Sequence, residues 1–389
     1  MTSPFHNPLT RAARGARRPP DVLRVALVHK MPTPYRVPVF DLLSDEPGID
    51  LTVVFSSRRE PNRHWSLPEG RARTVYLRER ILNLGENKYV HMNWGVGRVL
   101  RRIRPHVVVT NGYNVTDLLV LLHARLTGAR VVCQIDGTER SEQTLTRVHR
   151  IVRRLADRWT DAYAGPSDST LRLFGTFGAR PDAVFWSPLA VDNDAFTAPP
   201  LPERSADLLF SGRLTEVKNP LFAIRVAARA ADRLGRPVRL IVAGSGDLEG
   251  AMREEAARHP LLEVEFRGFV QQDDLPAVYA AARVFLFPTT WDPWGLVANE
   301  AAAAGAVTVA SPEAGAAGEL IRDGVEGLVL PLDEAAWADA VVRLLDEPDE
   351  LQRLSTASRE RVAAYSWRSA SDGYLHAVQH AARAAGGNP

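Results

Sequence analysis

Short apolar segments alternate with segments of helical spacing along most of this chain. In the first half, branched and apolar runs predict strands at residues 23–28, 49–55, 107–110, 129–134, 162–164 and 183–186. Apolar positions three and four residues apart separate these runs, as in YRVPVFDLLSD between the first two. Strands that alternate with helices indicate a parallel sheet covered by helices on both faces.

The second half repeats this rhythm after a proline-rich break, APPLP at residues 198–202. Its apolar runs predict strands at 208–211, 238–243, 264–267, 284–287, 307–310 and 327–330. The pattern therefore predicts an α/β protein of two doubly wound, Rossmann-like domains facing a central cleft. Sheets of this kind bind ligands beyond the carboxyl ends of their strands.

Composition narrows the class of protein. The 389 residues are 45% hydrophobic and 24% charged, which is typical of globular domains and argues against long-range disorder. Cys133 is the only cysteine, so the chain forms no internal disulfide and no cysteine-based zinc site. No apolar export signal follows the N-terminal arginines and no apolar run reaches 18 residues, so we expect a cytoplasmic protein without a transmembrane helix.

A cationic loop follows the first predicted strand of the second half. It reads SGRLTEVKNP, in which Gly212 permits close backbone approach to a ligand and Arg213 and Lys218 follow on the way into a helix. A planar guanidinium and a compact ammonium that converge at a helix start suit a diphosphate. The alternative is a pair of solvated cations.

An acidic loop, TWDPWGLVANE, follows the predicted strand at 284–287. Pro293 suits the first turn of a helix, which places Asp292 before that helix and Glu300 about two turns into it. We expect both carboxylates to point into one pocket, with the amides of residues 295–297 facing the same space. Such carboxylates suit the hydroxyls of ribose and hexose, and the alternative is an Asp cap with a Glu on an exposed helix face.

Two further loops end at the same predicted cleft. Gly244 opens a Gly-Ser-Gly turn after the strand at 238–243, and this turn is either a ligand loop or a simple reversal of the chain. Phe269 and Val270 follow the strand at 264–267 and offer a ring and backbone groups to a nucleobase.

Several segments of the second half resemble the GT4 family of retaining, GT-B-fold glycosyltransferases, also called glycosyl transferases group 1. They are LLFSGRLTEVKNP, LIVAGSGDLEGAM, the run from VEFRGFV to NEAAAAG, and SPEAGAAGELIRDGVEGLVL, in this order over about residues 207–332. AAYSWRSASDGYLHAV resembles the family's closing helix, whereas residues 21–200 resemble it diffusely. With the apolar pattern, this resemblance predicts a disordered basic tail (1–20), an acceptor-binding domain (21–197), a linker (198–203), a nucleotide-sugar-binding domain (204–365) and a C-terminal helix that crosses back to the first domain (366–389).

The resemblance also implies roles for residues of both loops. Arg213 and Lys218 would hold the donor diphosphate, Asp292 the transferred sugar and Glu300 the ribose. The backbone amides that would serve the sugar and the phosphate are those of Trp294, Gly295, Leu296 and Val297. No metal or other cofactor is expected, because cations and helix amides stabilise the leaving diphosphate. Most members of the family have Glu at the position of Asp292, so the donor sugar stays open.

The first half departs from the family at a central strand. Many members carry a His-Asp pair there, whereas this chain reads QIDGTER and offers Asp136. Asp136 is a candidate for orienting the acceptor or the leaving face of the sugar. The alternative is an Asp that forms a turn before Gly137.

Charge is distributed unevenly, and the first half is basic. Residues 1–200 hold 29 Lys and Arg against 19 Asp and Glu, whereas the remainder holds 19 against 27. Arginines gather on one predicted helix face and in a cluster beside Trp94; they include Arg98, Arg101, Arg147, Arg150, Arg154 and Arg158. One hypothesis is docking on an anionic lipid surface at the inner membrane face, where a lipid-linked acceptor is found, and the alternative is a solvated arginine-rich surface. Nucleic acid is disfavoured because no aromatic residues interleave with these arginines.

The predicted function is transfer of a hexose-type sugar from a nucleoside diphosphate sugar to a hydroxyl group of a lipid-linked glycan, a polysaccharide or a small natural product. The alternatives are a non-catalytic sugar-nucleotide-binding protein and another GT-B enzyme such as a nucleotide-sugar epimerase. A phosphorylase is disfavoured, because Lys218 is the only lysine beyond residue 200 and lies in the diphosphate loop.

Overall fold

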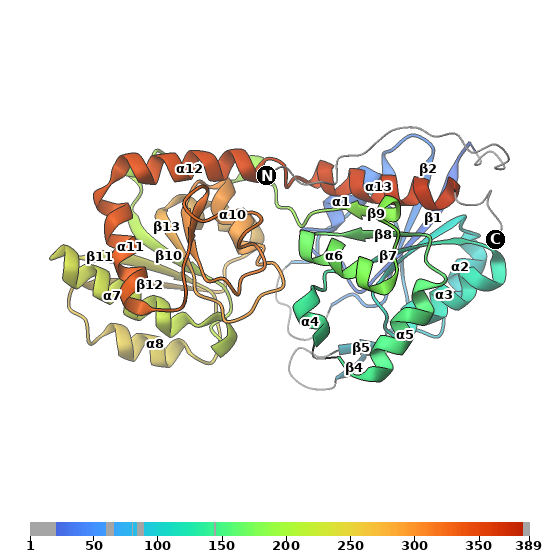
Figure 1. The fold of residues 1–389 in the computed structure, drawn as a ribbon, viewed down its shortest axis with the longest axis horizontal. Coiled ribbons are helices and arrows are strands. Elements are labelled where there is room, and N and C mark those ends of the chain that lie inside the picture. The colour runs from blue at the N-terminus through green and yellow to red at the C-terminus, as the bar shows by residue number, and fades with distance from the viewer. Residues whose placement is uncertain (1–20, 60–65, 80, 84–88, 144, 384–389) are drawn as a thin grey trace.

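Two parallel sheets, each flanked by helices, form the two halves of the molecule (Figure 1). The computed structural model of the chain describes residues 21–59, 66–79, 81–83, 89–143 and 145–383. The expected tail at 1–20 and residues 384–389 lie outside this part. The two sheets confirm the predicted α/β fold class.

The first sheet has the spatial order β3-β2-β1-β6-β7-β8-β9 within the described residues. Its strands are β1 (Leu23–His29), β2 (Ile49–Phe55), β3 (Arg73–Tyr76), β6 (Val107–Asn111), β7 (Arg130–Gln134), β8 (Ala162–Gly165) and β9 (Val184–Trp186). A separate antiparallel pair consists of β4 (Ile81–Asn83) and β5 (Tyr89–His91). The sequence did not predict β3, β4 or β5, because β3 is a largely exposed edge strand and the other two are three residues long.

Helices cover both faces of this sheet. One face carries α2 (Val96–Ile103), α3 (Val115–Thr127), α5 (Arg147–Asp157) and α6 (Asp168–Phe177), and the other carries α1 (Val37–Ser44) and α13 (Trp367–Arg383). The short helix α4 (Glu139–Gln143) follows β7. Local sequence sets these helices: α3 begins at a capping box between Asn114 and Asp117 and ends at Gly128, whose φ of 75° suits glycine.

The second sheet has the order β12-β11-β10-β13-β14-β15 within the described residues. Its strands are β10 (Ala206–Ser211), β11 (Val238–Ala243), β12 (Leu262–Gly268), β13 (Ala282–Phe287), β14 (Val307–Ala310) and β15 (Gly327–Val329). One face packs against α7 (Pro220–Leu234), α8 (Glu249–Ala256), α11 (Glu334–Asp346) and α12 (Pro348–Val362), and the other against α9 (Leu275–Ala280) and α10 (Val297–Ala303).

Each sheet contains a point where the strand order reverses. It lies between β1 and β6 in the first sheet and between β10 and β13 in the second. Ligands of doubly wound sheets bind in the crevice outside the carboxyl ends of the strands at such a point. The loops after β10 and β13 are the two that carry the predicted diphosphate and sugar residues.

The last helix belongs to the first sheet although it follows the second domain. Figure 1 shows α12 lying along the second domain and α13 continuing along the first. The Ser187 hydroxyl donates to the Ala370 carbonyl at 2.8 Å, and a Cβ on Gly373 would lie 2.1 Å from the Trp186 carbonyl. The chain therefore joins the two domains twice, before β10 and between α12 and α13.

Candidate active site

The cationic and acidic loops of the second domain are tied together by hydrogen bonds. The Val217 carbonyl accepts from the Thr290 amide at 2.9 Å and from the Thr289 hydroxyl at 2.8 Å. Lys218 Nζ then forms an ion pair with Asp292 Oδ2, and the two side chains are only 19% and 12% exposed. Two of the predicted donor residues therefore meet directly, at the point where the strand order of the second sheet reverses.

A third loop, residues 311–318, supports Asp292 from behind. The Asp292 amide donates to the Glu313 carbonyl at 3.2 Å, and the Asp292 carbonyl accepts from the Gly315 amide at 2.9 Å. A Cβ on Gly315 would lie 2.1 Å from the Pro293 carbonyl oxygen, so only glycine permits this contact. The backbone of Asp292 is consequently fixed on both sides.

The helix after the acidic loop starts later than the sequence predicted. The expected start at Pro293 is wrong: α10 begins at Val297 and Glu300 lies in its first turn. Gly295 is the reason, because its φ of +90° breaks helical geometry and a Cβ there would lie 2.3 Å from the Phe287 ring. The first bonded amide of this turn is that of Ala298, which leaves residues 295–297 at the helix start, where amides lack intrahelical partners.

Trp294 differs from the amides that follow it. Its own amide donates to Asp292 Oδ1 at 3.1 Å, so this amide holds the acid in place. Its side chain is buried, donates to Asn299 Oδ1 at 2.8 Å and stacks on Tyr365 at 5.5 Å between ring centroids. Trp294 thus joins the acidic loop to the core.

Glu300 is a buried carboxyl group on α10, only 5% exposed. Burial raises its pKa to about 7, and Tyr279 and Gln272 oppose this shift only in part. The group therefore changes its charge near neutral pH, which makes it sensitive to any hydroxyl group that donates to the ionised form.

The glycine turn after β11 packs against the cationic loop. Gly244 donates to the Gly268 carbonyl at 2.7 Å, and a Cβ on it would lie 1.8 Å from the Gly212 carbonyl oxygen. A Cβ on Gly246 would lie 2.5 Å from the Leu214 carbonyl oxygen. The role that the structure shows for Gly244 is therefore to let two loops meet backbone to backbone.

The remaining predicted donor residues differ in exposure. Gly212 has a φ of +151° and faces open space, since a Cβ added to it would meet no atom of the described residues within 4 Å. Arg213 is exposed, and Phe269 is 45% exposed directly after β12. Val270 is half-buried against the apolar cluster beneath α9 and α10.

The carboxyl edge of the first sheet carries a different kind of site. Asp136 Oδ1 accepts from Arg36 Nη2 at 2.7 Å and from Gln134 Nε2 at 2.7 Å, and the Asp136 side chain is 41% exposed. Arg36 is 1% exposed, and its Nε and Nη1 atoms have no hydrogen-bond partner among the described residues. Burial, together with the Arg36 charge, lowers the pKa of the neighbouring His29 to about 4, so this imidazole is neutral near pH 7. The sequence did not indicate Arg36, because PYRVP is typical only of a helix start.

The two domains touch beside these loops. Arg140 of α4 forms an ion pair with Glu313, whose carbonyl also binds the Asp292 amide. The amide of Asp168, at the start of α6, donates to Glu319 Oε2 at 2.9 Å. Burial raises the pKa of Glu319 to about 7. The loop that supports Asp292 therefore also reaches the first domain.

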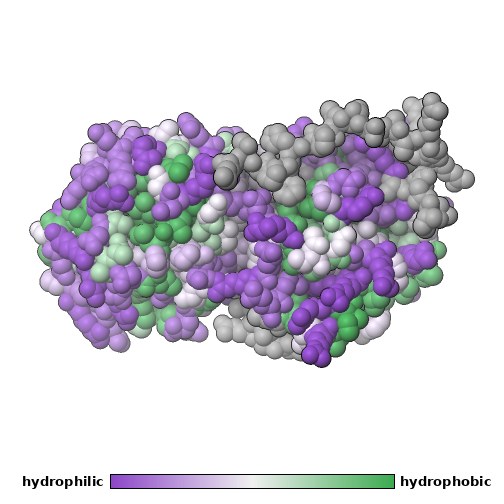
Figure 2. Space-filling model, in the orientation of Figure 1, coloured by the Kyte–Doolittle hydropathy of each residue, from purple (hydrophilic) through white to green (hydrophobic). Residues whose placement is uncertain are grey.

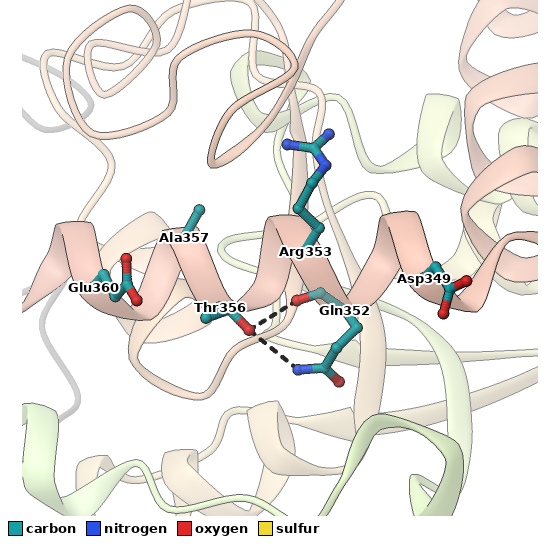
Figure 3. Close-up of a pocket in the computed structure, with 6 residues that line it drawn as sticks. All are labelled: Asp349, Gln352, Arg353, Thr356, Ala357 and Glu360. Carbon is teal, nitrogen blue, oxygen red and sulfur yellow. Dashed lines mark hydrogen bonds between the residues drawn. The ribbon is translucent and has the colours of Figure 1, made fainter.

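A surface depression on α12 lies apart from these groups (Figure 3). Its lining comes from one helix: Asp349, Gln352, Arg353, Thr356, Ala357 and Glu360. Gln352 Nε2 donates to Thr356 Oγ1 at 3.2 Å, so these side chains bind each other. A single helix face brings no groups from different loops together, and none of these residues was a predicted site residue.

Comparisons with known proteins identify the family of the chain. The family model described as glycosyl transferases group 1 matches residues 192–361. A glycogen synthase of Mycobacterium tuberculosis (strain ATCC 25618 / H37Rv) is 30% identical over 285 residues, which are 69% of this chain and 67% of the relative. The chain belongs to the glycosyl transferases group 1 family. It is a glycosyltransferase, as its sequence resemblance predicted.

Other relatives and solved structures extend this family assignment. A D-inositol 3-phosphate glycosyltransferase of Nocardia farcinica is 32% identical over 180 residues, 44% of this chain and 40% of the relative. The crystal structure of Anabaena Alr3699/HepE in complex with UDP and glucose has a TM-score of 0.69 at 14% identity, and covers 92% of this chain and 99% of that one. This group 1 glycosyltransferase therefore has the GT-B fold. No helix in the described ranges is both long and apolar enough to cross a bilayer.

Proposed function

We propose that this glycosyltransferase moves a hexose-type sugar from a nucleoside diphosphate sugar to a hydroxyl acceptor, with retention of the anomeric configuration. The observation that carries the proposal is the ion pair between Lys218 and Asp292. In a nucleoside diphosphate sugar the diphosphate is bonded directly to the anomeric carbon of the hexose. A cation that binds the diphosphate and an acid that binds the hexose must therefore lie side by side. The two loops provide this neighbourhood.

The cations of the first loop act on the leaving group. As the glycosidic bond breaks, negative charge grows on the diphosphate and positive charge on the sugar ring. Lys218 is held in place by Asp292, and the exposed Arg213 lies on the same loop. Fixed positive groups beside a growing negative charge lower the barrier without reorganising at the moment of reaction. No resident metal is required in this proposal.

The two acids hold the sugars on either side of the diphosphate. Asp292 accepts hydrogen bonds from hydroxyls of the transferred hexose, and its backbone is fixed by Glu313 and Gly315. Glu300 accepts from the ribose, with the amides of Gly295, Leu296 and Val297 nearby at the start of α10. Gly212, Phe269 and Val270 complete the proposed donor site, and Gly244 supports it through loop packing.

The first domain supplies the acceptor side. Asp136 is half exposed at the carboxyl end of β7 and is fixed by Arg36 and Gln134. We assign it to orienting the acceptor hydroxyl or the leaving face of the sugar. The acceptor itself stays among a lipid-linked glycan, a polysaccharide and a small natural product.

Similar structures that contain UDP or UDP-glucose favour UDP as the first nucleotide to test. Three structures of Anabaena Alr3699/HepE, in complex with UDP and glucose, UDP, and UDP-glucose, match this chain with TM-scores of 0.68 to 0.69. Calorimetric titration with UDP, GDP, ADP and dTDP, followed by the hexose conjugates of the nucleotide that binds, tests the donor. Release of nucleoside diphosphate with a hydroxyl acceptor, and the anomeric configuration of the product by NMR, test transfer and retention. Binding of the donor without sugar transfer to any hydroxyl acceptor would contradict the proposed reaction.

A further inference from the structure

The outward face of α5 joins a row of arginines to a row of apolar side chains. The arginines are all exposed: Arg147, Arg150 and Arg154 on α5, and Arg158 directly after it. Val148, Ile151 and Leu155 are 67%, 56% and 48% exposed. Each of these apolar residues directly follows an arginine, and one residue is about 100° around a helix, so the two rows run side by side. Figure 2 shows them as adjoining green and purple bands over α5 at the lower right of the molecule.

The opposite side of α5 fixes the helix to its domain. Ala156 is buried in the apolar cluster with α3, and the Thr146 side chain caps the first turn. Arg153 points inward, with its guanidinium 5.0 Å from the Tyr113 ring centroid and an ion pair to Glu142. The inner face therefore holds the helix, and the outer apolar row is left facing solvent.

Further exposed apolar side chains lie in the same helix layer. Trp159, two residues beyond the end of α5, is 42% exposed, and Leu122 and Leu126 on α3 are 47% and 77% exposed. Helices α2, α3 and α5 cover the same face of the first sheet (Figure 1). Exposed Arg98 and Arg101 on α2 add positive charge to this helix layer.

We propose that the outer face of α5, with Trp159, docks on an anionic lipid bilayer. An interfacial helix places apolar side chains at the boundary of headgroups and acyl chains and keeps basic side chains among the lipid phosphates. The acidic groups of the layer do not oppose this: Asp157 accepts from the Tyr163 hydroxyl, and Asp117 of α3 is buried. A soluble polyanion would pair with the arginines but leave the apolar row in water, so the two rows together fit a membrane surface.

Vesicle flotation tests the proposal without any donor or acceptor, so its outcome is independent of the proposed function. The full chain is mixed with vesicles of phosphatidylcholine alone or with 30% phosphatidylglycerol, at low and high salt. We expect binding to the anionic vesicles that weakens at high salt, and at least tenfold weaker binding to the neutral vesicles. Equal binding to both kinds of vesicle, or to neither, would overturn the proposal.

Matched variants separate the contributions of the two rows. Ile151→Ser with Leu155→Ser keeps the charge and should weaken binding to anionic vesicles at least tenfold. Arg150→Gln with Arg154→Gln should weaken it roughly 10- to 30-fold and reduce its salt dependence. The controls are Val325→Ser with Leu332→Ser, two exposed apolar positions of the second domain, and these should bind as the wild type does.

A titration with DNA tests whether the arginines bind a soluble polyanion instead of a membrane surface. Single-stranded DNA is titrated into the wild type and into Ile151→Ser with Leu155→Ser, and circular dichroism checks that the variant is folded. Vesicle binding that depends on the apolar row, with weak DNA binding, supports the membrane surface. DNA binding as tight as vesicle binding, together with vesicle binding unchanged in the apolar variant, would identify an electrostatic polyanion surface and contradict lipid docking.

Discussion

The sites at the two points of strand-order reversal, one in each domain of this glycosyltransferase, are built in different ways. In the second domain, loops after neighbouring strands interlock through their backbones, at Gly244 on Gly212 and at Gly315 on Pro293, and bring Lys218 to Asp292. In the first domain, side chains do this work: Arg36 and Gln134 fix Asp136. Backbone contacts require glycine at fixed positions, so they leave a recognisable pattern in the sequence. Side-chain networks join residues that are far apart in the chain, so they leave no such local pattern.

Removing the cations of the second domain should have the largest effect. Arg213→Gln with Lys218→Met is expected to lower the rate of sugar transfer by roughly 10³-fold or more, because positive charge beside the leaving diphosphate is lost. Steady-state kinetics measure the effect on the rate, and a thermal melt measures the effect on folding separately. Arg253→Gln with Arg258→Gln, exposed arginines of the same domain, is the control and should leave the rate unchanged. Wild-type turnover in the first variant would remove the diphosphate assignment.

Adding a methyl group at Gly244 tests whether the loops of the second domain need their close backbone contact. Gly244→Ala places a Cβ 1.8 Å from the Gly212 carbonyl oxygen and should lower the free energy of unfolding by about 3 kcal/mol or more. Gly250→Ala is the control: this residue lies in α8, an added Cβ would meet no other part of the described chain within 4 Å, and the substitution should raise the free energy of unfolding by roughly 0.5–1 kcal/mol. Urea denaturation of both variants gives the two values. Similar stability of Gly244→Ala and the wild type would show that the loops do not need close backbone contact.

Disrupting the side-chain network of the first domain should affect transfer but not donor binding. Asp136→Asn is expected to lower transfer roughly 10- to 100-fold, since a positioned carboxylate is lost. Arg36→Gln should act in the same direction, because it removes the cation that holds Asp136. Affinity for the nucleoside diphosphate, measured by calorimetry, should stay within about twofold of the wild type. A comparable loss of nucleotide affinity would place Asp136 on the donor side.

The smallest effect expected is a pH dependence from Glu300. With a pKa of about 7, this carboxyl group is protonated at pH 6 and mostly ionised at pH 8. If the ionised form accepts the ribose hydroxyls, nucleotide affinity rises about tenfold between these pH values, and Glu300→Gln lacks this rise. Calorimetry of both proteins at pH 6, 7 and 8 isolates the carboxyl group from the titration of the nucleotide. Identical pH profiles would contradict the ribose role.

The same shift has a consequence for stability. A carboxyl group whose pKa is raised on folding favours the folded state fully below its unfolded pKa, and this contribution is lost as pH rises through about 7. Glu300→Gln should therefore gain stability relative to the wild type at pH 8 compared with pH 5. Glu319 has a similar pKa and remains in both proteins, so its contribution cancels in this difference.

The sequence predicted the fold from buried strands and missed what depended on contacts between distant segments. Apolar runs located the central strands of both sheets, but β3 is too exposed to form such a run. The positions of the cationic and acidic loops could be predicted from the sequence, because each loop follows a buried strand. The start of α10 was misplaced, because Pro293 favours a helix start locally whereas Gly295 must turn against the Phe287 ring. Arg36 and Glu313 act through partners at distant positions in the chain, and no local pattern marks either one.

Donor affinity in two variants tests the central claim, that a cation for the diphosphate and an acid for the adjoining hexose meet in one place. Binding of the nucleoside diphosphate and of its hexose conjugate is measured by calorimetry for Lys218→Met and Asp292→Asn. Lys218→Met should weaken both ligands at least tenfold, whereas Asp292→Asn should weaken the hexose conjugate more than the nucleoside diphosphate. Equal weakening of both ligands by Asp292→Asn, or unchanged affinity in Lys218→Met, would contradict this division of roles.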